Sequence, residues 1–157
     1  MAKRFGAAVA RRFAQRGVAV LVTYLRVDET PAPGVPEAYR RNRAAGADEV
    51  VGEISARGGR AVGVETDLSD PAAPARLFNV AERELGPVDI LVNNATGWVQ
   101  DTFAPATQDA FGRTLRPVTL ESFERQFAVD AMPQRCSSQN SRAATSNGTV
   151  AGAGSSV

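Results

Sequence analysis

Apolar residues in the first part of the chain fall into helical and strand patterns that follow one another. From Gly6 to Arg16 they recur at helical spacing, and Gly17 stands where a glycine in the left-handed conformation ends a helix. The aliphatic run from Val18 to Thr23 shows no polar alternation. Such a run predicts a strand that is buried on both faces, as in a parallel sheet.

The same succession continues with elements whose ends carry their usual signals. Gly58 ends a polar helix, Asp70 suits the N-cap of a later helix with Pro71 at its first position, and Gly86 ends that helix. The predicted elements are a helix at 37–57, a strand at 60–65, a helix at 71–85 and a short buried strand at 89–92.

Helices that alternate with strands predict an α/β fold with a doubly wound parallel sheet. A strand should precede the first helix of such a sheet, and none precedes Gly6, so we expect the first strand to be missing. A long loop then leads to a last helix at 119–132, after which all periodicity is lost. We predict one partial domain at 4–132 and a low-complexity tail at 133–157.

Composition narrows the function classes. The 157 residues carry a net charge of +1, which gives no reason to propose nucleic acid or an anionic membrane as a partner. The single cysteine, Cys136, excludes an internal disulfide, and the lack of histidine excludes a His/Cys metal site. No apolar run approaches the roughly 20 residues that cross a bilayer, and no signal peptide is recognised. We expect a cytoplasmic protein.

The segment from Gly86 to Ala95 has the sequence GPVDILVNNA. It resembles the G-x-[IVL]-D-[IVL]-L-V-N-N-A segment of the short-chain dehydrogenase/reductase family, which implies a Rossmann-like fold. The resemblance implies that Asn93, Asn94 and Ala95 border the adenosine half of NAD(P), beyond the carboxyl ends of the strands. Thr96 replaces a glycine of the family pattern, so close backbone approach there is altered.

The resemblance assigns further cofactor contacts. Asp67, with Leu68 beside it, matches the acidic residue near the adenine amino group, although it also suits a helix-entry turn. Arg26 follows the strand after which the ribose 2′ position is recognised, and a basic residue there favours NADP, unless it is simply exposed. Gly6 matches the last glycine of the family's phosphate-binding turn. The middle glycine is replaced by Arg4, so we expect a broken pyrophosphate site.

The catalytic residues of the family are a serine and a Tyr-x-x-x-Lys pair. Here the tyrosines are Tyr24 and Tyr39, both too early, and no lysine follows Lys3. Asp130 stands at the position of the family's assisting asparagine. Trp98 begins a longer loop than the family pattern has, and suits either packing or the substrate side. We predict no catalytic residue in this chain.

The tail has a second interpretation besides a flexible terminus. If permitted GC-rich codons for Pro133 to Val157 are read one base earlier, they can spell AAALLIAEFARRHVEWDGRRGRIVG. That string contains a helical apolar pattern and then GRIVG, the start of a buried strand, as the family pattern continues. We therefore predict a one-base deletion near the codon for Met132, which leaves Cys136 without a role.

Three interpretations of function follow. The first is an inactive fragment of an NADP-dependent oxidoreductase, similar to 3-oxoacyl-carrier-protein reductases and acting on a small carbonyl or alcohol. The second is a non-catalytic module that pairs with an intact relative, since oligomers are common in the resembling family. The third is a remnant without function, whose incomplete sheet would expose an edge.

Overall fold

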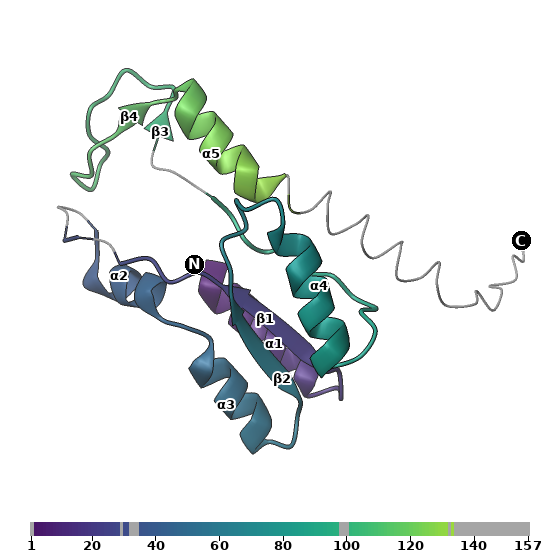
Figure 1. Ribbon diagram of the computed structural model, residues 1–157. Helices are drawn as coiled ribbons and strands as arrows, with labels where there is room; N and C mark the ends of the chain where they lie inside the picture. Colours follow the sequence, from purple (N-terminus) through teal and green to yellow (C-terminus); the bar gives the residue numbers. More distant parts are fainter. Residues whose placement is uncertain (1, 29, 32–34, 98–100, 132, 134–157) are drawn as a thin grey trace, which may run out of the picture.

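The computed structural model describes residues 2–28, 30–31, 35–97, 101–131 and 133, with the side chains of 2–4 left out. Two parallel strands form the centre of its fold. Helices surround these strands, and the last helix of the chain lies beyond them (Figure 1). In chain order the elements are α1 (Ala2–Ala14), β1 (Val20–Tyr24), α2 (Glu37–Ala44), α3 (Asp48–Ala56), β2 (Ala61–Glu65), α4 (Ala73–Glu84), β3 (Asp101–Thr102), β4 (Arg116–Pro117) and α5 (Leu120–Asp130). The α/β class with parallel strands is thus confirmed.

β1 and β2 run in register from Val20 opposite Ala61 to Tyr24 opposite Glu65. α1 packs along β1 and against α3, where the Arg11 Nε lies 2.6 Å from a carboxylate oxygen of Glu53. α3 and α4 both contact β2. The buried apolar side chains of the described residues come from these helices and the turn before α3: Ala10, Ala47, Ile54, Ala73, Phe78 and Ala81.

The glycines that were predicted to end helices do so. Gly17, Gly58 and Gly86 have φ values of 80°, 79° and 105°, a region that residues with a side chain rarely adopt. The first helix, however, begins at Ala2 rather than Gly6. Lysine, arginine and alanine are good helix formers, so the helix extends back through the residues before Gly6.

The helix predicted over 37–57 is wrong as a single element. Ala45 is extended, with φ −71° and ψ 143°, and separates α2 from α3. The break lets Ala47 become buried against β2, since a Cβ added at Gly63 would lie 3.1 Å from the Ala47 Cβ. Gly46 supports it, because glycine is a poor helix former.

The buried strand predicted at 89–92 is also wrong. The segment has no regular structure, and Ile90, Leu91 and Val92 are 53%, 42% and 48% exposed. A strand needs a neighbour for its backbone groups, and within the described residues β1 pairs with β2 alone. The same cause leaves β1 half-buried rather than buried on both faces.

The third helix starts two residues later than predicted. Asp70 accepts a hydrogen bond from the Ala72 amide at 2.9 Å, but this stabilises the turn before α4. The helix begins at Ala73, and Pro74 rather than Pro71 lies in its first turn, where the missing N–H costs nothing.

α5 begins as the sequence indicates. Thr119 caps it, with its side chain accepting from the Ser122 amide while the Ser122 hydroxyl accepts from the Thr119 amide. That hydroxyl also lies 2.6 Å from an Asp101 carboxylate oxygen, which ties α5 to the short β3–β4 pair. None of the described helices has the length and apolarity that crossing a bilayer requires.

Candidate functional site

Polar side chains predicted to bind a cofactor collect where β1 and β2 end together. The Thr66 amide donates to the Tyr24 carbonyl at 2.8 Å, so the two chains leave the sheet at the same edge. Arg26 follows β1 by two residues and Asp67 follows β2 by two. In open α/β sheets this carboxyl edge is where ligands bind.

Arg26 is held by Glu65 across the ends of the strands. Its Nε lies 3.1 and 3.0 Å from the two carboxylate oxygens, and its NH2 lies 2.5 Å from one of them. The Arg26 amide also donates to Glu65 at 3.1 Å. These hydrogen bonds, with the charge of Glu65, raise the pKa of Arg26. Glu65 was not predicted as a site residue, since its only signal in the sequence is its place at the end of a strand.

Asp67 is engaged in the turn that follows β2. Its Oδ1 accepts from the Ser69 amide at 2.8 Å and from the Ser69 hydroxyl at 2.7 Å, and the second carboxylate oxygen makes neither bond. The residue is exposed. Asp67 therefore stabilises the turn that leads to the next helix, which was the alternative prediction for this residue. Only its Oδ1 makes the hydrogen bonds of that turn.

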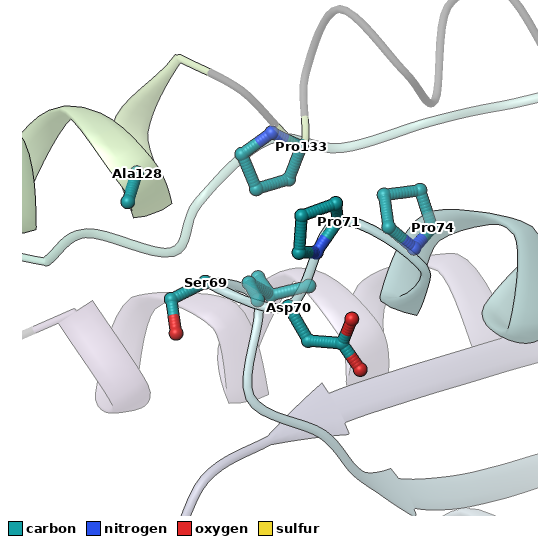
Figure 2. A pocket seen from close by; sticks show the side chains of 7 residues that line it. Ser69, Asp70, Pro71, Pro74, Ala128 and Pro133 are labelled. Carbon is teal, nitrogen blue, oxygen red and sulfur yellow. The ribbon is translucent and has the colours of Figure 1, made fainter.

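Leu68, half-buried, lines a small pocket between the start of α4 and the end of α5. Figure 2 shows Pro71 and Pro74 facing Ala128 and Pro133 across it. The Asp70 carboxylate belongs to an ion pair with Arg76 at 2.7 Å. The lining is therefore mainly aliphatic and proline-rich, which suits packing of α5 on the core better than chemistry.

Gly6 and Asn94 lie side by side although 88 positions separate them. A Cβ added at Gly6 would lie 2.9 Å from the Asn94 Nδ2, so the glycine leaves room for the amide. Gly6 lies within α1 rather than in a turn before it. The described residues thus contain no glycine-rich turn at the start of α1, and the side chain of Arg4 lies outside them.

Asp130 holds the turn after Asn94 rather than projecting toward a ligand. Its Oδ1 accepts from the Gly97 amide at 2.8 Å, and its Oδ2 lies 3.4 Å from both the Thr96 hydroxyl and the Gln126 Nε2. Asn93 and Ala95 are exposed and Asn94 is half-buried in the same turn. Asp130 is therefore a positioning residue for the segment predicted to border adenosine.

The residues fit a dinucleotide cofactor in part. The carboxyl edge offers the Arg26 guanidinium and the Asp67 carboxylate, which suit a ribose 2′ substituent and adenosine. The described residues supply no pyrophosphate-binding turn, because Gly6 lies within α1. Trp98 and Cys136 lie outside the described residues, and no group of three His, Cys, Asp or Glu side chains inside them could hold a metal.

Comparison with known proteins gives a consistent result. A sequence model of the short chain dehydrogenase family matches residues 1–123. An uncharacterized oxidoreductase of Methylorubrum extorquens is 32% identical over 130 residues, which cover 83% of this chain and 41% of that protein. Versicolorin reductase 1 of Aspergillus parasiticus is 33% identical over 129 residues, which cover 82% and 38%. The chain thus spans about two fifths of these relatives.

Solved structures agree with the fold. A short chain dehydrogenase from Mycobacterium avium superimposes with a TM-score of 0.62 at 28% identity, covering 88% of this chain and 41% of that one. A short chain dehydrogenase from Burkholderia cenocepacia, solved in complex with NADP, gives 0.59 at 28% identity, covering 88% and 45%. A blue fluorescent protein from a metagenomic library, solved with NADPH, gives the same values.

Proposed function

Because the chain belongs to the short-chain dehydrogenase family, we propose that its described residues form the adenosine-binding half of an NADP-dependent oxidoreductase. The observation that carries this proposal is that β1 and β2 end at the same edge of the sheet, with Arg26 two residues beyond β1 and Asp67 two residues beyond β2. Related chains bound to NADP or NADPH support the choice of cofactor. The substrate of the longer protein would be a small carbonyl or alcohol.

The 157 residues should not catalyse hydride transfer on their own. When bound, the nicotinamide of the cofactor supplies or accepts the hydride, and a protein group must move the accompanying proton. The tyrosines are Tyr24, at the end of β1, and Tyr39, in α2, and no lysine follows Lys3 to lower a tyrosine pKa. The chain therefore contributes binding and orientation, and the proton donor belongs to sequence outside it.

Two measurements on the 157-residue chain test this proposal. Calorimetric titration should detect weak binding of NADP, and replacement of Arg26 by glutamine should weaken it, whereas Arg57→Gln at the end of α3 should not. NADPH absorbance should stay constant with a panel of ketones. An NADP affinity that is the same in Arg26→Gln as in the native chain would contradict the proposal, and so would oxidation of NADPH above background.

We further propose that residues 133–157 are translated from a shifted frame. The support is the string AAALLIAEFARRHVEWDGRRGRIVG that the other frame can spell, with a helical pattern followed by a strand. Sequencing the DNA from upstream of codon 1 to well beyond codon 157 tests it. If the other frame continues into a Tyr-x-x-x-Lys motif, restoring one base should restore an NADP-linked enzyme. If no such frame exists, the tail is genuine.

A second candidate function is pairing with an intact short-chain dehydrogenase. The observation that favours it is the exposed apolar side of α5, where Leu120, Phe123 and Phe127 are 72%, 55% and 52% exposed. The two phenyl rings stack with centroids 5.2 Å apart. Co-expression with a full-length relative should give a complex that Phe123→Ser disrupts and Phe111→Ser, on the exposed loop before β4, leaves intact. Migration as a free monomer would exclude it.

A further inference from the structure

The guanidinium of Arg26 is already bound to a carboxylate at the proposed adenosine site. We infer that Glu65 is a specificity-determining residue: it neutralises Arg26 and weakens the preference for a ligand that carries a 2′-phosphate. The inference rests on the proposed function and concerns how the same site discriminates between adenine nucleotides. A basic residue alone at this place would favour the phosphorylated ligand.

The pairing of these two residues follows from the strand register. Glu65 lies opposite Tyr24, so its side chain reaches the backbone just beyond the end of β1. One carboxylate oxygen accepts from both the amide and the Nε of Arg26, each at 3.1 Å. The other is 3.0 Å from the Nε and 2.5 Å from an NH2. The carboxylate therefore occupies the Nε–NH2 side of the guanidinium, one of the two sides that could hold a phosphate through paired hydrogen bonds.

The charged side chains that surround Arg26 are acidic. Besides Glu65, the carboxylate that acts on it electrostatically is that of Asp48, the first residue of α3. A phosphate dianion must displace Glu65 or bind beside it against repulsion. The pair is accessible to solvent, with side-chain exposures of 55% for Arg26 and 33% for Glu65. Water therefore screens the electrostatic repulsion between Glu65 and a bound phosphate. Removal of the Glu65 charge should therefore change phosphate affinity by about three- to tenfold.

A purely structural role for Glu65 makes a different prediction. If the carboxylate only ties the end of β2 to the chain beyond β1, its loss would loosen the edge of the sheet. Ligands with and without the 2′-phosphate would then lose affinity to the same degree. The ratio of the two affinities distinguishes these roles. It changes if Glu65 competes with the 2′-phosphate for Arg26, and it stays constant if the substitution only loosens the edge of the sheet.

The experiment compares 5′-AMP with adenosine 2′,5′-bisphosphate by calorimetric titration of the 157-residue chain. In the native chain the two dissociation constants should lie within about threefold of each other. Glu65→Gln should raise the affinity for the bisphosphate about three- to tenfold and leave that for 5′-AMP within about twofold. Glu53→Gln is the matched control: it removes an equal charge from the Arg11 pair, between α1 and α3, and should alter neither affinity.

The possible results separate the inference from the proposed function. If 5′-AMP binds but Glu65→Gln leaves the ratio unchanged, the inference falls and the proposed function stands. If the native chain, folded by circular dichroism, binds neither nucleotide, both fall. If the variant fails to fold, the native ratio decides: a preference for the bisphosphate above about threefold shows that Glu65 does not mask Arg26.

Discussion

Gly97 offers a sharp test of how α5 is attached to the rest of the chain. A Cβ added there would lie 2.9 Å from the Val129 Cβ, 3.1 Å from its Cγ2 and 3.1 Å from the Arg125 carbonyl oxygen. The φ of Gly97 lies outside the left-handed region. The cost of Gly97→Ala is therefore steric, and neither a helix backbone nor a β-branched side chain moves easily.

The expected magnitude follows from two opposing effects. Overpacking of a close contact costs about 1–3 kcal/mol. Alanine also lowers the conformational entropy of the unfolded chain, which stabilises the folded state by about 0.4–1 kcal/mol. We expect Gly97→Ala to lower the free energy of unfolding by about 1–2 kcal/mol. Urea unfolding followed by circular dichroism measures it, and hydrogen exchange of α5 locates it.

Gly52 is the matched control because the same substitution there should have the opposite sign. It is exposed within α3, and an added Cβ would meet no atom within 4 Å. Gly52→Ala should therefore raise the free energy of unfolding by about 0.5–1 kcal/mol through helix propensity. If Gly97→Ala proved as stabilising as Gly52→Ala, the contact between the 94–97 turn and α5 would not exist in solution.

Three other changes test separate parts of the structure. Asp130→Ala should destabilise the chain by about 1–2 kcal/mol because the Gly97 amide loses its acceptor, whereas Asp130→Asn should retain most stability in the same urea assay. The hydrogen bond from Arg11 lowers the pKa of Glu53, so this pair stabilises the fold above pH 4.5 and is lost on further acidification. Glu53→Gln should therefore flatten the acid limb of the stability curve, and an unchanged limb would refute the pair. Gly6→Ala should weaken adenine-nucleotide binding in a calorimetric titration, because the new methyl group would lie 2.9 Å from the Asn94 Nδ2 and must displace that amide; equal binding would count against the site.

Local signals make the glycine-terminated ends of helices predictable from the sequence. Gly17, Gly58 and Gly86 each adopt a positive φ at the end of a helix, as the residue type indicates. The ten-residue string at 86–95 likewise indicates the fold class from the amino-acid sequence alone. These features depend on a few neighbouring residues, which is why the sequence contains them.

Contacts between distant residues were not predictable in the same way. The break at Ala45 exists because Ala47 packs against β2, 16 positions later at Gly63. The hydrogen bonds between Asp130 and the 96–97 turn span more than 30 positions. Glu65 was missed for the same reason: a glutamate at a strand end gives no sign that its partner, Arg26, lies 39 positions earlier.

The two errors about strands have one physical cause. The Val20 amide donates to the Arg60 carbonyl, and the Tyr24 carbonyl accepts from the Thr66 amide. Between these residues, the backbone N–H and C=O groups of successive residues point alternately toward β2 and away from it. Leu21 and Thr23 must turn their backbone groups to the edge of β1 away from β2. The Thr23 hydroxyl is itself buried without a hydrogen-bond partner. An apolar run such as 89–92 forms a strand only when a neighbour pairs with it, so the pattern in the sequence is necessary for a buried strand but cannot produce one alone.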